Sequence, residues 1–454
     1  MVILKSQHRM LNEQSIIIPV LQSIRSPLNA LTTIHRSYGD LVLGRFLNKK
    51  LLFVCKPEDI EEVYSQEAKG LLSRDFLYHA KKSLFGDGLI NSKGRLWVNQ
   101  RRIMQPIFSR DAIPEWEKVI SEEAESTKNK LINTTDAEIN ISKELKILIQ
   151  RTFIKILMGI SVDNMSNRDV LVKSINNISK GLLPLMVAEI ISNGKLMWFM
   201  PNKKRQYQEA VNQLTAFVNQ EIASKYEQTG HDLISLLIQA KDKKTGYSMT
   251  KELLKDETVN LFFAGQDTTI NTLAWFFYLI GKNESVHKKI TDELIKYKDD
   301  PLTLENLAKL SYTKASLYET LRLYPSTTAL ATQALEDVVI GGQNIAKGTT
   351  IILSMYVTHH HNKLWERPNE FYPEHFLNPL ETERHKYAFF PYGGGLHNCI
   401  GRHFVEMEMM IIIATLLREF TFKTDADVKE AVSITLKPCR DVIVTLMPIS
   451  TRLK

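Results

Sequence analysis

The sequence is poor in the residues that build disulfide frameworks, zinc fingers and flexible linkers. It contains only three cysteines, Cys55, Cys399 and Cys439, an odd number without a C-x-x-C spacing. This pattern argues against a disulfide framework and a cysteine-rich zinc site, and it favours a reducing compartment. The 20 glycines and 15 prolines among 454 residues are too few for collagen-like repeats or long flexible linkers.

Long apolar runs are missing as well. The longest runs, at 16–21 and 409–417, fall well short of the roughly 20 residues that a membrane-spanning helix needs. Polar residues such as Lys5 and Arg9 interrupt the N-terminal segment before it could serve as a signal peptide. The sequence therefore predicts a soluble cytoplasmic protein without a transmembrane anchor.

Basic residues are in slight excess but are not gathered in one place. The 58 Lys and Arg residues outnumber the 51 Asp and Glu residues and give a formal net charge of +7. Nucleic-acid binding would need these charges to cluster with stacking aromatic side chains, so we expect no nucleic-acid partner. With 44% hydrophobic residues, the composition is that of an ordinary globular protein with a large core.

Hydrophobic periodicity predicts a mainly α fold with small β-sheets. Strand-like patterns occupy 41–55, 338–354 and 434–447, and helical patterns fill about 57–324 and 400–418. Within the last strand-rich part, we expect one strand around Ile434. The proline-containing stretch from Asn362 to Asn398 is long and irregular, which is typical of a functional loop. We expect a single domain over 1–454.

One predicted helix, from Thr250 to Leu279, has an unusual middle. Thr250 suits an N-cap, but the apolar pattern is interrupted by AGQDTT at 264–269, whose Gly, Asp and Thr are poor helix formers. A hydroxyl beside a carboxylate would pass protons inward, and Gly265 would let a flat ligand approach the backbone. The alternative is a threonine that bonds to its own helix and an aspartate that faces water.

Two further features carry chemistry. Glu319 and Arg322 lie three residues apart on a helix, which alone is typical of a surface ion pair. The loop at 390–401 reads FPYGGGLHNCIG and delivers Cys399 to the start of a helix, where thiolate is favoured. On its own, Cys399 fits a buried structural thiol, a catalytic nucleophile or a metal ligand. The glycines do not match a phosphate-binding loop.

Taken together and in this order, these features resemble the cytochromes P450, the haem-thiolate monooxygenases. WVNQR at 97–101 and FYPEHF at 371–376 also match, so the resemblance spans nearly the whole chain. It implies the cytochrome P450 fold, a triangular helical haem domain, of soluble bacterial type and not fused to a reductase. Cysteine ligation of haem iron favours cleavage of the O–O bond in this family.

The resemblance implies a role for each matched residue. Cys399 would be the axial ligand of the iron of haem b (iron protoporphyrin IX), and Asp267 and Thr268 would deliver protons. The remaining cofactor-binding residues would be Trp97, Arg101, His397, Gly265, Tyr392, Gly393 and Gly395, of which Trp97, Arg101 and His397 approach the haem propionates. Glu319, Arg322 and His375 would lock the core.

Some positions depart from the family pattern. Tyr392 stands where phenylalanine is usual, His397 and His375 stand where arginine is commoner, and Thr332 replaces a further arginine near a propionate. A neutral imidazole gives one N–H donor and no charge, so we expect haem retention to weaken as His397 loses its proton.

The implied reaction inserts one oxygen atom of O2 into an apolar organic substrate, such as a fatty acid or terpenoid. Electrons would come from NAD(P)H through a ferredoxin or flavodoxin with its reductase, or through a flavin reductase. A separate donor is expected because only about 55 residues follow Cys399, too few for a fused domain. This donor would dock on positive charge from Arg95, Arg102, Arg402 and His403.

Apolar segments, chiefly 178–200, would line the substrate pocket and allow peripheral membrane contact without an anchor. We expect a monomer. Two other functions stay open, a peroxide-driven or isomerising haem-thiolate enzyme and a non-catalytic haem-binding sensor. Proton delivery by Asp267 and Thr268 weighs against both.

The remaining histidine and cysteine features suggest no site. His359, His360 and His361 are adjacent, so their side chains should point in different directions, and no partner ligand stands at useful spacing. Cys55 and Cys439 look like strand residues without chemistry. We therefore expect no metal site besides the Cys399 iron ligand.

Overall fold

The computed structural model describes residues 13–16, 26–46, 49–162, 168–192, 201–226, 230–377 and 383–449. The chain divides into two compact units. The first unit consists of Met1–Phe76 and Tyr318–Cys399, and the second consists of Leu77–Leu317 and Ile400–Lys454.

The first unit is built on a mixed six-stranded sheet with the strand order β1-β2-β3-β9-β6-β4. Its strands are β1 (Gln14–Ser15), β2 (Leu41–Phe46), β3 (Lys49–Val54), β4 (Leu72–Ser73), β6 (Leu330–Ala334) and β9 (Thr350–Leu353). β3 pairs antiparallel with β2 and parallel with β9. The last four residues of β3 are buried without alternation, as expected for a strand covered on both faces. A separate hairpin pairs β7 (Val338–Ile340) with β8 (Gln343–Ile345).

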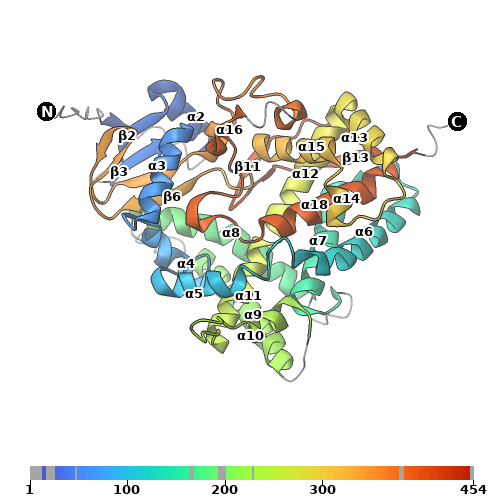
Figure 1. Ribbon diagram of the computed structural model, residues 1–454, viewed down its shortest axis with the longest axis horizontal. Helices are drawn as coiled ribbons and strands as arrows, with labels where there is room; N and C mark the ends of the chain where they lie inside the picture. The colour runs from blue at the N-terminus through green and yellow to red at the C-terminus, as the bar shows by residue number, and fades with distance from the viewer. Residues whose placement is uncertain are drawn as a thin grey trace. The chain divides into compact units, whose positions relative to one another are not determined.

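Helices of the first unit pack beside this sheet. They are α2 (Pro27–Tyr38), α3 (Pro57–Ala68), α16 (Met355–His359), the end of α15 (Ser311–Leu323) and the 3-10 turns η5 (Pro373–Phe376), η6 (Lys386–Ala388) and η7 (Gly395–His397). Pro57 occupies the first turn of α3, where its missing N–H costs nothing, so the predicted start of this helix is confirmed. Ile60 and Val63 of α3 join the core with sheet residues such as Leu52, and Figure 1 shows α3 beside β2, β3 and β6.

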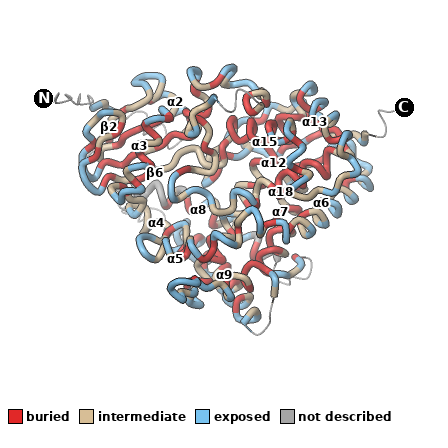
Figure 2. The backbone as a smooth tube through the Cα atoms, in the orientation of Figure 1, coloured by how far each residue is buried: buried red, intermediate tan, exposed pale blue. Residues whose placement is uncertain are grey.

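The second unit is mainly helical. Its longer helices are α4 (Tyr78–Phe85), α5 (Gly94–Met104), α6 (Glu117–Ile132), α7 (Ile141–Met158), α8 (Arg168–Ser192), α9 (Pro201–Tyr226), α11 (Lys251–Ala264), α12 (Asp267–Lys282), α13 (Glu284–Lys296) and α18 (Arg402–Leu417). Shorter ones are η2 (Ile113–Trp116), α10 (Leu233–Gln239) and α14 (Leu304–Leu307). α12 and α18 are largely buried (Figure 2), as expected for helices that are apolar on every side.

Small sheets complete the second unit. One has the order β10-β13-β5, from β10 (Phe420–Lys423), β13 (Ile443–Pro448) and β5 (Glu138–Asn140). The other pairs β11 (Glu430–Val432) with β12 (Leu436–Pro438). The predicted strand around Ile434 is wrong, because Ile434 lies in the turn between β11 and β12. Isoleucine is β-branched and favours strands, but the chain reverses direction here between two paired strands, and this tertiary arrangement decides its conformation.

The single helix predicted over 250–279 is also wrong. The structure ends α11 at Ala264 and starts α12 at Asp267. The break falls on Gly265 and Gln266, where Gln266 has ψ −66° and φ −104°, and glycine weakens a helix interior. The N-cap is confirmed, because the Thr250 hydroxyl accepts a hydrogen bond from the Leu253 amide at 3.2 Å.

In the described part of the chain, no helix is both long enough and apolar enough to cross a bilayer. The helix expected at 400–418 is α18 and is confirmed to within two residues. The irregular stretch between α16 and α18 contains the short 3-10 turns named above among its described residues, so its prediction as a long loop is also confirmed.

Candidate functional site

Cys399 lies on a tight glycine loop of the first unit, three residues before α18 begins. Gly393 and Gly395 have φ values of 72° and 62°, a left-handed region that side chains disfavour. The Cys399 amide donates a hydrogen bond to the Tyr392 carbonyl at 2.9 Å and closes the loop. Cys399 is exposed and forms no disulfide. The reading of Cys399 as a buried structural thiol is therefore excluded.

A pair of tyrosine rings, tilted at 32° to each other, packs against this loop. The rings of Tyr64, on α3, and Tyr387 have their centroids 5.1 Å apart. A Cβ at Gly394 would lie 2.6 Å from an atom of each ring, and one at Gly395 would lie 2.9 Å from Tyr64. The packing of the loop against these rings therefore requires glycine at both positions.

The donor on this loop suits the cofactor that the family resemblance implies. A thiol is a soft ligand for iron, and here it is exposed at the end of the glycine loop. His397, in η7, and Tyr392 are each partly exposed on the same loop. The residues present thus fit an axial thiolate ligand.

The Glu319–Arg322 pair is completely buried in the first unit, which excludes a surface ion pair. Arg322 Nη2 and Nε donate to the two carboxylate oxygens of Glu319, each at 2.7 Å. The remaining three N–H groups of Arg322 donate to the carbonyls of His359, Pro368 and Glu370 at 2.7, 2.8 and 3.1 Å. All five guanidinium donors are therefore used, which offsets the cost of burying the charge.

His375 completes this network. Its Nδ1 lies 3.1 Å from Glu319 Oε2, and its Nε2 lies 2.5 Å from the Glu366 carbonyl oxygen. The Tyr372 amide also donates to Glu319, at 3.0 Å. Both nitrogens of His375 thus face oxygen acceptors, one on each side of the ring. The ring thereby links the Glu319 carboxylate to the backbone at Glu366.

The α11–α12 junction of the second unit holds Asp267 and Thr268. Asp267 Oδ2 accepts a hydrogen bond from the Ser179 hydroxyl of α8 at 3.3 Å. Burial raises the pKa of Asp267, and the Ser179 hydrogen bond opposes this shift. The Thr268 hydroxyl donates to the Ala264 carbonyl at 2.8 Å. Thr268, in α12, therefore bonds back to the last residue of α11, close to the backbone bond that one sequence interpretation expected, whereas Asp267 is partly buried.

Gly265 has a packing reason of its own. A Cβ at this position would collide with the ring of Phe153 on α7. Trp97 and Arg101 lie four residues apart on α5 and therefore share one face of that helix. Both are partly buried. These residues, with Asp267 and Thr268, belong to the second unit, whereas the cysteine loop and the Glu319 network belong to the first.

Sequence reasoning missed two buried carboxyl groups of the second unit. Glu408 on α18 and Glu257 on α11 are both fully buried, and burial raises the pKa of each to about 8. Glu257 accepts a hydrogen bond from the Leu89 amide at 3.0 Å. The sequence did carry a sign that Glu408 is buried, because this acidic residue stands between two apolar residues, Met407 and Met409.

Known proteins share this sequence and fold. The family model described as Cytochrome P450 matches residues 13–446. Mouse "Cytochrome P450 4V2" is 28% identical over 82% of this chain and 74% of its own length. "Cytokinin hydroxylase" of Arabidopsis thaliana is 28% identical over 81% of this chain and 73% of its own length. "Cyclooctat-9-en-7-ol 5-monooxygenase" of Streptomyces melanosporofaciens is 26% identical over 86% and 84%.

A solved structure supports the same assignment at the level of the fold. The crystal structure of the cytochrome P450DA heme domain superposes with a TM-score of 0.86 at 22% identity, covering 97% of this chain and 98% of that one. The chain therefore belongs to the cytochrome P450 family, and it is a cytochrome P450 monooxygenase, for which the family implies a haem cofactor.

Proposed function

We propose that Cys399 binds the iron of haem b and that the enzyme inserts one oxygen atom of O2 into an apolar organic substrate. The observation that carries this proposal is the exposed thiol on a glycine loop that the Cys399–Tyr392 hydrogen bond closes, within a chain that matches the cytochrome P450 family over 13–446. When bound, the haem supplies the activation of O2, which protein side chains alone do not provide.

Asp267 and Thr268 are the proposed proton carriers. The raised pKa of Asp267 makes its carboxyl a better proton source near neutral pH than an exposed aspartate. Thr268 is the next residue along α12, and its hydroxyl oxygen keeps lone pairs that can accept a proton while its own O–H is held by Ala264. We assign Asp267 Oδ as the donor and Thr268 Oγ1 as the next atom in the route.

The other cofactor roles are also proposals. The Trp97 indole, the Arg101 guanidinium and the His397 imidazole offer N–H donors suited to the haem propionates. Tyr392, Gly393, Gly395 and Gly265 are proposed to line the cofactor. Of these four, Gly395 and Gly265 also have the packing roles described above, so their presence is not by itself evidence of cofactor contact.

A lipophile such as a fatty acid or terpenoid is the proposed substrate class. The Streptomyces relative is named for its action on cyclooctat-9-en-7-ol, which supports this class. Leu182 and Leu185 of α8 are buried, so ordinary helix packing accounts for them. Residues 193–200 of the expected pocket segment lie outside the described residues. Peripheral membrane contact stays a prediction.

A separate electron donor, using NAD(P)H through a ferredoxin or flavodoxin with its reductase or through a flavin reductase, is proposed. The expected docking charges are partly neutralised locally: Arg402 donates to Glu406, and Arg102 donates to Asp242, each at 3.0 Å. A cytoplasmic monomer remains the expected form. The three cysteines lie outside any disulfide, as expected in a reducing compartment.

The test is the carbon monoxide difference spectrum of the reduced protein beside a Cys399→Ala control. We expect a strongly red-shifted Soret band that the control lacks. An imidazole-like band, or haem binding unchanged by Cys399→Ala, would reject thiolate ligation. Turnover with hydrogen peroxide alone, and none with any reductase, would favour the peroxide-driven alternative.

A further inference from the structure

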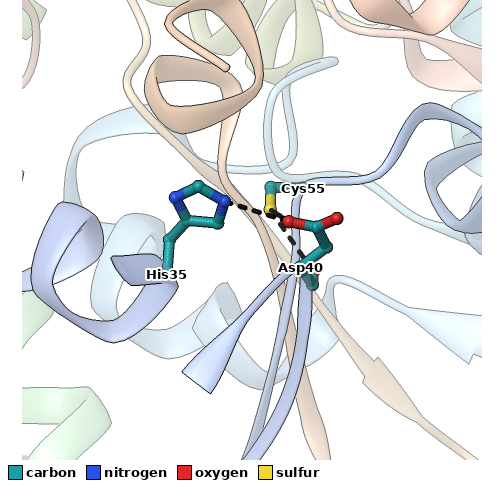
Figure 3. Close-up of side chains that lie close together, drawn as sticks. All are labelled: His35, Asp40 and Cys55. Atoms are coloured by element: carbon teal, nitrogen blue, oxygen red, sulfur yellow. Dashed lines mark hydrogen bonds and ion pairs between the residues drawn. The ribbon is translucent and has the colours of Figure 1, made fainter. Parts of the chain in front are cut away.

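A second cluster of metal-binding side chain types lies in the first unit, away from the cysteine loop in the sequence. Figure 3 shows His35, Asp40 and Cys55 pointing toward one another. One ligand atom from each residue lies within 4.8 Å of the others. His35 Nε2 is 3.0 Å from Asp40 Oδ1, and Cys55 Sγ is 3.9 Å from the same oxygen.

The backbone holds these three residues in place. α2 carries His35 in its last turn, and Gly39, with φ 100°, turns the chain back so that Asp40 precedes β2. β2 and β3 pair with Leu41 opposite Val54, which places Cys55 beside Asp40. The Cys55 amide and thiol both donate to the Asp40 carbonyl, at 3.1 and 3.3 Å. The arrangement is thus fixed by sheet register before any ligand binds.

His361 positions the carboxylate. Its Nε2 lies 3.0 Å from Asp40 Oδ1, and its Nδ1 accepts a hydrogen bond from the Lys363 amide at 3.1 Å. Since Nδ1 is an acceptor, the proton of the neutral ring sits on Nε2 and is donated to Asp40. His361 is therefore a positioning residue for Asp40 and not a ligand.

The three histidines of the run do point in different directions, as predicted. His359 Nε2 accepts from the Phe390 amide at 3.1 Å, and His360 Nδ1 lies 2.9 Å from the Tyr356 carbonyl oxygen. His361 nevertheless reaches Asp40 across the fold, a contact that spacing along the chain does not reveal.

The donor set matches one cation in particular. Imidazole nitrogen, carboxylate oxygen and thiolate sulfur are the ligands that zinc prefers, and three protein ligands leave one position for water. Burial and the nearby Asp40 and Asp59 carboxylates raise the pKa of the Cys55 thiol, so the thiol keeps its proton in the absence of a cation. A divalent cation would displace that proton to solvent, and the ligands Asp40 and Cys55 would then balance its charge.

We propose that His35 Nε2, Asp40 Oδ1 and Cys55 Sγ bind one Zn²⁺ ion, with His361 orienting Asp40 through a hydrogen bond. The ion would tie α2 to the ends of β2 and β3. On binding, Cys55 releases one proton to solvent, and the His35 ring proton resides on Nδ1, which leaves the Nε2 lone pair for the metal. No step of this proposal depends on the haem site.

The experiment uses the full-length, haem-loaded protein, stripped with a chelator and then dialysed against Zn²⁺. Bound zinc is measured by elemental analysis, and the thermal unfolding midpoint is measured with and without zinc. We expect about one zinc per chain and a higher midpoint with zinc. Cys55→Ala and His35→Gln should abolish both effects, while His361→Gln should weaken zinc affinity by about tenfold, as for other residues that orient metal ligands.

Matched controls separate this site from other thiols and imidazoles. Cys439→Ser removes an exposed thiol, and His231→Gln removes an imidazole with a 93% exposed side chain; neither should change zinc binding. Midpoints measured without metal show whether Cys55→Ala and His35→Gln are folded. The proposal is overturned if the wild type binds no zinc, or if folded Cys55→Ala and His35→Gln bind zinc as the wild type does. Replacing Zn²⁺ with Co²⁺ gives a second readout, because thiolate ligation adds a charge-transfer absorption that Cys55→Ala must lose.

Discussion

The imidazole of His375 lies 3.1 Å from the buried carboxylate of Glu319, while its opposite nitrogen faces the Glu366 carbonyl. The ring therefore bridges a carboxylate and a backbone carbonyl. Glu319 contacts both His375 and Arg322 in a site closed to solvent.

This relationship predicts opposite outcomes for two substitutions of His375. His375→Gln leaves a side chain that cannot span both acceptors as the ring does, so the hydrogen bond to the Glu319 carboxylate is lost or weakened. We expect it to lower the free energy of unfolding by about 1.5–3 kcal/mol. His375→Arg offers several N–H donors to the same acceptors and should retain most of the stability. Urea unfolding with parallel measurement of haem content checks this. Equal losses in both variants would contradict a role for hydrogen-bond donors at this position.

Gly395 and Gly401 offer a matched pair of glycines around the proposed haem ligand. Gly395→Ala forces a side chain into the left-handed region and toward Tyr64, so we expect a loss of about 1–3 kcal/mol in unfolding free energy. Gly401 has φ −87° and no atom within 4 Å of an added Cβ. Gly401→Ala should therefore change stability by less than about 0.5 kcal/mol. A similar loss in both variants would contradict the role assigned to the tyrosine pair.

Asp267→Asn tests proton delivery. An amide cannot donate a carboxyl proton, so we expect product formation to fall by about 10²-fold or more, while haem content stays at the wild-type level and reducing equivalents are still consumed. Ser179→Ala is the companion variant. It removes the hydrogen bond that lowers the pKa of Asp267, so the pH profile of product formation should move to higher pH. Wild-type coupling in Asp267→Asn would exclude this carboxyl as the proton source.

The sequence predicted those parts of the fold and site that depend on local chemistry. Pro57 marked the start of α3, Thr250 marked a helix cap, and the poor helix formers at 264–269 marked the junction of α11 and α12, although a single helix was expected there. What the sequence could not supply were contacts between distant segments. The support of Gly395 by Tyr64 depends on tertiary packing, and the meeting of His35, Asp40 and Cys55 depends on strand register, which no spacing along the chain reveals.

Glu408→Gln tests the buried carboxyl of α18 through the pH dependence of stability. Burial raises the pKa of Glu408 to about 8 in the folded state, whereas an unfolded chain has an ordinary value near 4.3. The folded protein therefore holds this proton more tightly, and stability must fall as the pH rises between these two values. Each unit of pKa difference corresponds to about 1.4 kcal/mol. Between about pH 5 and about pH 9, the unfolding free energy of the wild type should therefore decrease more than that of Glu408→Gln. We expect the two decreases to differ by at least about 1.4 kcal/mol. Comparing how unfolding free energy changes with pH, rather than its absolute value, cancels the constant cost of burying the amide.

Glu305→Gln, which replaces an exposed glutamate of α14, is the control and should show the same pH dependence of stability as the wild type. If Glu408→Gln also shows the wild-type pH dependence, Glu408 gains water access in the folded protein.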